Sequence, residues 1–365
     1  MSKLKVLISG GGTGGHAYPA IAIANALKAI NPEAQILFVG AKGKMEMEAV
    51  PKAGYRIKGL WISGFSRSVS VKNALFPFKL IWSILHSFFI VLKFRPNVAI
   101  GTGGFASGPV LQVASWLGTP IYLQEQNAFP GVTNRLLAKR AKKICVAYEG
   151  MEKYFRSKQV FYSGNPIRSE VIDIADKHDQ AFKHFGLKDR FTVLIVGGSL
   201  GARPINQALK NNLDQLLAED IQLIWQTGKV SFKEISDAIK NKFENRIMAL
   251  KFIDRMDLAY AAADVIVSRA GAIAVSELSV IGKPVILAPY PLAAENHQLA
   301  NAQSLVKLDA AVLVTDDRAN EDLVPQIITL LHDPKKRREL GMNIAKLGIP
   351  DAADRIAKLI LDEVK

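Results

Sequence analysis

Cysteine is almost missing from this sequence, because Cys145 is the only one among 365 residues. This excludes a disulfide framework and a cysteine-based metal cluster, and it is typical of proteins in a reducing compartment. The sequence also lacks an Asp-x-Asp motif, and its six histidines do not fall at metal-ligand spacing. We therefore expect no metal and no other cofactor. The amino terminus has neither the apolar core nor the cleavage site of a signal peptide, so we expect a chain that is not exported.

Acidic residues are fewer than basic ones. There are 33 Asp and Glu against 47 Lys and Arg, which gives a formal net charge of +14. This excess predicts an anionic partner, and nucleic acid, acidic lipid and phosphorylated substrates all qualify. The sequence has no zinc-finger spacing and no aromatic signature of an RNA-binding sheet, so we do not expect nucleic acid.

Short β-branched runs alternate with longer helical patterns along the whole chain. This alternation predicts α/β domains, each with a doubly wound parallel sheet that binds ligands at the carboxyl ends of its strands. The length favours two domains. Gly164, Asn165 and Pro166 interrupt the pattern, so we predict one domain over residues 1–164 and a second over 165–349. The last helix, about 350–365, is expected to pack back on the first domain.

Three glycine-rich turns each follow a short apolar run, at residues 10–15, 101–104 and 197–202. Such a turn, followed by a helix, lets backbone N–H groups approach a phosphate closely. The first turn also fits G-x-G-x-x-G, the pattern of dinucleotide-binding folds. The second strand ends at residues 38–42 without the acidic residue that would hold a ribose 2′-hydroxyl, which argues against an NAD enzyme.

Several polar side chains follow predicted strands and are candidates for chemistry. His16 follows the first glycine turn, where a neutral imidazole could accept a proton from a substrate hydroxyl, or could merely cap a helix. Residues 124–127 follow the strand 121–123 and could bind sugar hydroxyls or cap the next helix. In the turn and helix of 268–277, Glu277 could hold ribose hydroxyls, or it could be an ordinary surface glutamate.

The apolar stretch 75–94 is long enough to be mistaken for a membrane span. A polar stripe with a spacing of seven residues argues against a span and comprises Lys72, Lys79, His86 and Lys93. The pattern fits a helix in a membrane interface, or a core helix with one wet edge. The basic cluster at 139–143 favours a membrane-facing surface. We predict that this surface includes Leu75, Ile81, Trp82 and Trp116.

With these motifs assembled, the sequence closely resembles the bacterial MurG family of lipid II-forming N-acetylglucosaminyltransferases. The matching segments, in family order, are 11–20 (GGTGGHAYPA), 101–109 (GTGGFASGP), 125–134 (EQNAFPGVTN), 164–168 (GNPIR), 197–202 (GGSLGA) and 268–277 (SRAGAIAVSE). The resemblance implies a GT-B glycosyltransferase with two domains facing a cleft. It implies inverting transfer of GlcNAc from UDP-GlcNAc to the 4-hydroxyl of MurNAc in undecaprenyl-diphosphoryl-MurNAc-pentapeptide (lipid I), a step of peptidoglycan synthesis.

The resemblance also implies roles for individual residues. His16 would be the catalytic base, and Glu125 would assist it. The residues expected at the UDP-GlcNAc site are Thr13, Gly14, Gly15, Asn127, Arg168, Ser199, Ile253, Ala272, Ile273, Ala274, Val275, Ser276, Glu277 and Gln298. Those expected at the acceptor diphosphate are Gly12, Gly103 and Gly104. The chain departs from the family at Leu200, where Gln is common, and at His297, where some relatives have Gln.

Two other functions fit the same motifs. The chain could glycosylate another lipid acceptor such as diacylglycerol, or it could be a non-catalytic nucleotide-sugar-binding subunit. The resemblance favours UDP-GlcNAc and lipid I as substrates, and an anionic membrane surface as a partner. It implies a peripheral position at the cytoplasmic face of the bacterial inner membrane, with the cell-wall synthesis or division machinery as a further partner.

Overall fold

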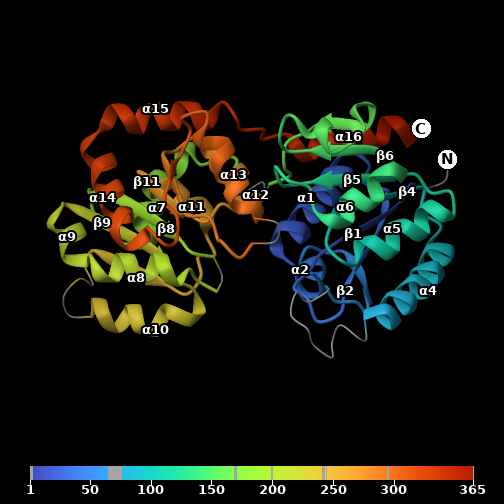
Figure 1. Ribbon diagram of the computed structural model, residues 1–365, viewed down its shortest axis with the longest axis horizontal. Coiled ribbons are helices and arrows are strands. Elements are labelled where there is room, and N and C mark those ends of the chain that lie inside the picture. The colour runs from blue at the N-terminus through green and yellow to red at the C-terminus, as the bar shows by residue number, and fades with distance from the viewer. Residues whose placement is uncertain are drawn as a thin grey trace. The chain divides into compact units, whose positions relative to one another are not determined.

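The computed structural model describes residues 3–64, 76–167, 171–198, 200–240, 243, 245–293 and 296–364. The chain divides into two compact units. The first unit comprises Met1–Ile167 with Ile349–Lys365, and the second comprises Arg168–Gly348. Each unit is a parallel sheet with helices on both faces, as Figure 1 shows. The predicted α/β class with two doubly wound sheets is therefore confirmed.

The first sheet has seven parallel strands in the order β3-β2-β1-β4-β5-β6-β7. Their bounds are β1 (Lys5–Gly10), β2 (Gln35–Ala41), β3 (Arg56–Leu60), β4 (Val98–Gly103), β5 (Ile121–Glu125), β6 (Ala141–Val146) and β7 (Val160–Tyr162). The central strands are buried, as expected where helices cover both faces of a sheet. The strand order reverses between β1 and β4, so the first two glycine turns lie together at the topological switch point, where such sheets bind ligands.

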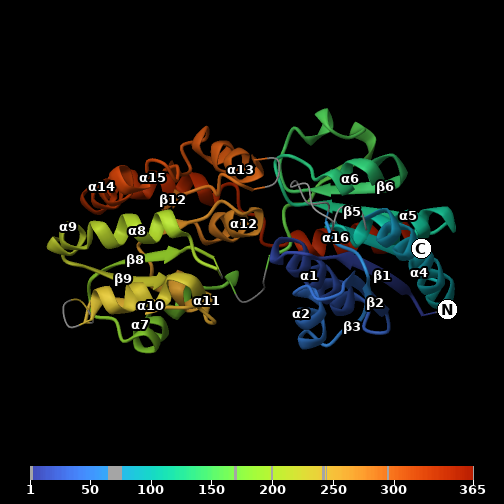
Figure 2. The same ribbon diagram turned by 60° about the horizontal axis from the view of Figure 1, so that its bottom comes forward.

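Helices cover both faces of this sheet. Their bounds are α1 (Gly14–Ile30), α2 (Glu46–Lys52), α4 (Phe76–Phe94), α5 (Ser107–Trp116), α6 (Val132–Leu137) and α16 (Ala352–Val364). The last helix, red in Figures 1 and 2, belongs to this first unit. Its buried residues Ile356 and Ile360 share an apolar core with Ile8 of β1 and Ile23 of α1. The chain therefore returns to its first unit after completing the second.

The single cysteine, Cys145, lies in the apolar core of the first unit. Cys145 on β6 is buried in the same core as Tyr122 on β5. The Tyr122 hydroxyl donates a hydrogen bond to Glu363 on α16 at 2.9 Å. Burial, aided by the nearby Glu363 charge, raises the pKa of the Cys145 thiol to about 12. The thiol therefore stays protonated at neutral pH and fills the core as a small apolar group.

Helix α4 exposes many of its large apolar side chains, while Ile90 and Val91 are buried against the first unit. Its buried residues include Ser83 and Ser87, and the Ser83 hydroxyl donates to the carbonyl of Trp61 at 3.1 Å. The outward side chains are 40–69% exposed and comprise Phe78, Ile81, Trp82, Leu85, Phe88, Phe89 and Leu92. By length and composition this helix could cross a membrane. A core helix with one wet edge does not describe it, because the exposed side is itself rich in large apolar side chains. Lys72 and Leu75 lie outside the described residues.

The second sheet has six parallel strands in the order β10-β9-β8-β11-β12-β13. Their bounds are β8 (Phe191–Val196), β9 (Ile221–Gln226), β10 (Ile247–Leu250), β11 (Val265–Ser268), β12 (Val285–Leu287) and β13 (Val312–Leu313). The helices are α7 (His178–Phe185), α8 (Arg203–Asn211), α9 (Leu213–Ala218), α10 (Gly228–Ile239), α11 (Met256–Ala262), α12 (Ala272–Ile281), α13 (His297–Val306), α14 (Ala319–His332) and α15 (Pro334–Ala345). Here the order reverses between β8 and β11, so the switch point lies beside the third glycine turn and the turn before α12.

Candidate active site

The first two glycine turns pack against each other, backbone to backbone. Gly103 and Gly104 have φ angles of +96° and +85°, which side chains rarely tolerate. A Cβ atom at Gly104 would collide with the carbonyl oxygen of Gly11. The motif therefore needs glycine at these positions in order to bring the ends of β1 and β4 into contact.

His16 lies in the first turn of α1, beside both glycine turns. Its Nδ1 atom is 3.2 Å from the Oγ1 atom of Thr13, the extended residue that precedes the helix. Its carbonyl oxygen accepts a hydrogen bond from Thr102 Oγ1 at 2.8 Å. The imidazole packs on Gly103, where a Cβ atom would lie 3.0 Å from His16 Nε2. These contacts fix the ring, and they place Nε2 over a backbone that has no side chain.

Glu125, at the end of β5, holds the loop that follows it. Its carboxylate is buried and accepts hydrogen bonds from the backbone N–H groups of Asn127 and Gly131, at 3.0 and 3.1 Å. The side-chain amides of Asn127 and Asn134 donate to it as well, at 3.2 and 2.9 Å. Burial raises the pKa of this carboxyl, and the hydrogen bonds oppose that shift. Both oxygens are thus engaged in shaping the loop that carries Asn127.

Buried amide side chains join this loop to its neighbours. Gln126 donates to the carbonyl of Thr102 at 2.7 Å, which links β5 to the end of β4. Gln124 donates to Asn165 Oδ1 at 2.8 Å, and Asn165 donates to the carbonyl of Gln126 at 3.0 Å. Because buried amides are costly to leave unpaired, this network fixes the position of the loop relative to the glycine turns.

In the second unit, the turn between β11 and α12 is held by a largely buried ion pair. Arg269 donates to Asp316 through Nη2 at 3.0 Å, and to the carbonyl of Ala288 at 2.9 Å. Both charged side chains are only 13% exposed. The guanidinium also lies over the ring of Tyr290, 5.6 Å from its centroid. The turn therefore presents the first amides of α12 from a fixed position, which suits a phosphate at a helix N-terminus.

Glu277 lies on α12, one to two turns behind those amides. Its side chain is 4% exposed, and Oε2 accepts a hydrogen bond from the hydroxyl of Tyr260 at 3.1 Å. A buried carboxylate with a fixed hydrogen-bond donor is not an ordinary surface glutamate. It has the chemistry to accept hydrogen bonds from vicinal hydroxyl groups.

Two further residues predicted at the UDP-GlcNAc site, Ile253 and Gln298, form hydrogen bonds within the protein. The N–H of Ile253 donates to Gln226 Oε1 at 3.0 Å, so the predicted contact with a base would need another atom of Ile253. Gln298 accepts a hydrogen bond from the N–H of Tyr290 at 2.9 Å, so its amide oxygen is engaged. Arg168 and Ser199, which were also predicted to meet the diphosphate, lie outside the described residues.

Known proteins match the chain over nearly its whole length. Residues 6–146 match the glycosyltransferase family 28 N-terminal domain, and residues 192–356 match its C-terminal domain. Proteins of Flavobacterium psychrophilum and Christiangramia forsetii are 49% and 50% identical over 365 and 367 residues, which cover 99% of each chain. Both are named UDP-N-acetylglucosamine--N-acetylmuramyl-(pentapeptide) pyrophosphoryl-undecaprenol N-acetylglucosamine transferase. The crystal structure of Acinetobacter baumannii MurG superposes with a TM-score of 0.78 at 26% identity, covering 99% of both chains.

The chain belongs to the MurG family. Its two doubly wound units are therefore the GT-B architecture that the resemblance implied. Solved structures outside the MurG family share this fold, and a UDP-GlcNAc 2-epimerase from Neisseria meningitidis matches with a TM-score of 0.70 at 14% identity. That likeness concerns the fold alone.

The structure brings the predicted MurG-family residues together within each unit. In the first unit, the predicted residues lie at or just beyond the ends of β1, β4 and β5, which are neighbours in the sheet; they are Gly12–His16, Gly103, Gly104, Glu125 and Asn127. In the second unit, residues 272–277 and Gln298 lie beyond β11 and β12, which are also neighbours. Their contacts with substrates stay predictions.

Sequence reasoning missed Glu46, which lies beneath the first glycine turn. The N–H of Gly12 donates to Glu46 Oε2 at 2.9 Å, so this amide is already used by the protein. The predicted contact between Gly12 and the acceptor diphosphate would therefore need another atom of that residue. The second strand ends near Lys42 without an acidic residue, and Glu46 comes later, within a charged segment that is typical of a surface loop. No signal in a single sequence distinguishes it.

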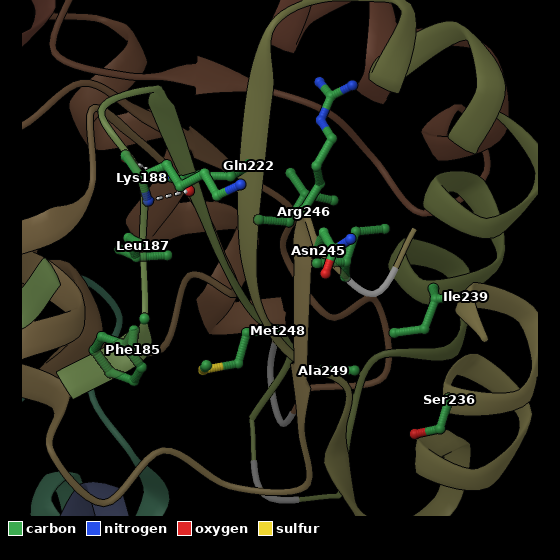
Figure 3. A pocket seen from close by; sticks show the side chains of 13 residues that line it. Phe185, Leu187, Lys188, Gln222, Ser236, Ile239, Asn245, Arg246, Met248 and Ala249 are labelled. Carbon is green, nitrogen blue, oxygen red and sulfur yellow. Dashed lines mark hydrogen bonds between the residues drawn. The ribbon is translucent and has the colours of Figure 1, made fainter. Parts of the chain in front are cut away.

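A cavity of about 550 Å³ lies elsewhere in the second unit, as Figure 3 shows. It is lined by the ends of α7 and α10, by β10 and by the amino end of β9. The amino end of β9 lies at the edge of the sheet opposite the switch point. Gln222 there accepts from the N–H of Lys188 at 3.1 Å, and Arg246 donates to the carbonyl of Ile221 at 2.9 Å. None of the predicted site residues lines this cavity.

Proposed function

We propose that this chain transfers GlcNAc from UDP-GlcNAc to the 4-hydroxyl of MurNAc in undecaprenyl-diphosphoryl-MurNAc-pentapeptide, which converts lipid I to lipid II. The observation that carries this function is the full-length identity of 49–50% to relatives named for this transfer. The fold agrees with it, since each sheet presents its polar and glycine-rich segments at its own switch point. A diacylglycerol acceptor has no comparable support.

The second unit holds the nucleotide sugar in this proposal. The first amides of α12, at residues 272–274, meet the diphosphate, and Glu277 holds the ribose hydroxyls. The carbonyl of Ile253 meets the uracil edge. The rigid turn supported by Arg269 and Asp316 favours this assignment, because a fixed amide cluster binds an anion without first being ordered.

The first unit receives the acceptor, and His16 takes its proton. In an inverting displacement the 4-hydroxyl oxygen bonds to C1 of GlcNAc, and the bond from C1 to the UDP oxygen breaks. The hydroxyl proton passes to Nε2 of His16. When Nδ1–H donates to Thr13 Oγ1, which lies 3.2 Å away, Nε2 carries the lone pair that this step needs. Glu125 acts as a positioning residue, because its carboxylate already accepts four donors in the 126–134 segment.

The exposed face of α4 contacts the membrane in this proposal. Large exposed apolar patches mark interaction sites, and the acceptor proposed here carries an undecaprenyl lipid. Trp116 at the end of α5 is 55% exposed, and α5 packs directly on α4. The basic cluster at 139–143 adds attraction to anionic lipid. This surface supports a peripheral position at a membrane, while the cytoplasmic face and the cell-wall synthesis or division machinery stay predictions of the resemblance.

The substrate assignment can be tested with the purified chain, UDP-GlcNAc and either lipid I or diacylglycerol. We expect release of UDP and formation of lipid II with lipid I, and only background UDP release with diacylglycerol. A mass spectrum of the extracted lipid identifies the product. Release of UDP with diacylglycerol but not with lipid I would overturn the proposed acceptor. Tight UDP-GlcNAc binding without turnover on either lipid would indicate a non-catalytic subunit.

The membrane surface can be tested by replacing Ile81, Trp82 and Phe89 with serine. These side chains are more than half exposed, so the fold should tolerate the change. We expect the partition coefficient onto phosphatidylglycerol-containing vesicles to fall at least about tenfold. The reason is that the variant has less apolar surface to transfer from water into the bilayer. Serine at Val230, Leu292 and Leu308, which are exposed residues of the second unit, provides the matched control. Vesicle binding that equals the control would remove α4 from the membrane contact.

A further inference from the structure

Glu46 is a fully buried carboxylate that the proposed reaction does not use directly. It occupies the first turn of α2 and is 0% exposed. Its Oε1 atom accepts from the N–H of Ala41 at the end of β2, and its Oε2 atom accepts from the N–H of Gly12, each at 2.9 Å. The carboxylate thus joins the second strand to the first glycine turn.

The space around this carboxylate is fitted to it. A Cβ atom added at Gly11 or at Gly40 would collide with the Glu46 side chain. Two glycines from two strand ends therefore make the slot in which the side chain lies. Burying a charge is costly, and here two amide donors and the N-terminal end of α2 compensate for the lost water. Because the Glu46 carboxylate is held in one position, it also fixes the position of the glycine turn whose N–H group it binds.

In dinucleotide-binding folds, the second glycine of this turn lets the backbone approach a pyrophosphate. In this chain the corresponding amide, that of Gly12, is bound by Glu46 instead. We infer that Glu46 is a positioning residue for sugar transfer, which replaces a bound phosphate with a protein carboxylate and so fixes the turn that carries Thr13 and His16. This inference rests on the proposed function, in which His16 takes the proton.

The path from Glu46 to His16 is short. Gly12 precedes Thr13, whose Oγ1 atom lies 3.2 Å from His16 Nδ1. The imidazole is confined on its other side by Gly103. A displacement of Gly12 therefore moves Thr13, and with it the orientation of the ring. Misplacement of a reacting group by about 1 Å can cost on the order of 100-fold in rate.

The chemistry of the two contacts requires a carboxylate. Both partners of Glu46 are N–H donors, and only an acceptor-only group satisfies both. Glutamine has the same shape but offers one oxygen and one NH₂ group. In Glu46→Gln the side-chain NH₂ group therefore faces one of the two backbone N–H groups. Because both groups are donors, they cannot form a hydrogen bond, and the glycine turn must shift.

The first test compares Glu46→Gln with Glu48→Gln, which removes the same charge from an exposed position on the same helix. We expect Glu46→Gln to lower kcat at least about tenfold. The affinity for UDP, measured by calorimetry, should stay unchanged, because the proposed nucleotide contacts lie in the second unit, whereas Thr13 is expected near the donor sugar. Glu48→Gln should match the wild type. A wild-type kcat in Glu46→Gln would overturn the inference.

The second test asks whether Glu46 acts through His16. In a His16→Ala background, Glu46→Gln should cause no further loss of kcat. If the two residues act independently, the fold-losses of kcat in the single variants multiply in the double variant, and that result would overturn the inference. If Glu46→Gln fails to fold, Glu46→Asp replaces it, since a shorter carboxylate keeps the charge but draws the turn inward. A wild-type kcat in Glu46→Asp would also overturn the inference. Failure of the wild-type chain to transfer GlcNAc at all would instead overturn the proposed function.

Discussion

His16→Ala should lower kcat for the transfer of GlcNAc to lipid I by about 10²- to 10⁴-fold, the usual contribution of a positioned general base. The affinity for UDP-GlcNAc should not change, because His16 belongs to the first unit and the proposed nucleotide contacts lie in the second. Steady-state kinetics with saturating lipid I gives the first quantity. Calorimetric titration with UDP-GlcNAc gives the second.

This split between turnover and binding distinguishes a base from a structural residue. His16 packs on Gly103 and neighbours Thr13, so a purely structural loss would lower thermal stability and all activities together. His184→Ala, at an exposed position of the second unit, is the matched control and should be silent. Unchanged turnover would remove His16 from the mechanism. A parallel fall in UDP-GlcNAc affinity would assign it to the donor instead.

The architecture was predictable because it rests on local pattern. Alternation of β-branched runs with helical stretches requires only the nearest residues, and the glycine turns mark where strands end. The location of the turns at one edge of the sheet was also predictable, because parallel strands joined by helical crossovers have their carboxyl ends at the same edge. His16 could be singled out for the same reason, as it directly follows a turn of known geometry.

The features that sequence did not reveal depend on contacts between distant segments. Glu46 and Gly12 are far apart in the chain, and only the fold brings them within hydrogen-bonding distance. For Glu125, the residue type predicted a polar strand end, but not the four donors that its carboxylate would accept. Burial decides what a carboxylate does, and burial is a property of the tertiary structure.

Helix α4 shows the limit of hydropathy as a guide to packing. The stretch is rich in Phe, Ile and Leu, so composition alone allows either a core helix or a membrane surface. The structure buries Ile90 and Val91 together with two serines against the protein and leaves Phe89 outward. Helix α5 packs on α4, and the Ser83 hydroxyl is hydrogen-bonded to the carbonyl of Trp61. The remaining large apolar side chains face outward, where only a lipid or protein partner can cover them.

The second large effect is expected at Glu277. Glu277→Ala should raise the KM for UDP-GlcNAc about 10- to 100-fold, because hydrogen bonds to a charged group contribute about 1.5–3 kcal/mol. Tyr260→Phe provides the matched comparison, since it removes the hydroxyl that donates to Glu277 but keeps the carboxylate. We expect a much smaller change in KM for Tyr260→Phe. Initial rates over a range of UDP-GlcNAc concentrations measure both.

A donor lacking one ribose hydroxyl makes this test specific. The wild-type chain should bind a 2′-deoxy or a 3′-deoxy analogue more weakly than UDP-GlcNAc. Removal of the hydroxyl leaves the buried Glu277 carboxylate without one of the hydrogen-bond donors proposed for it. Glu277→Ala should bind the deoxy and the normal donor equally, since the group that senses the hydroxyl is gone. If Glu277→Ala still discriminates fully between the donors, another residue holds the ribose. In that case Glu277 serves only to fix α12 through Tyr260.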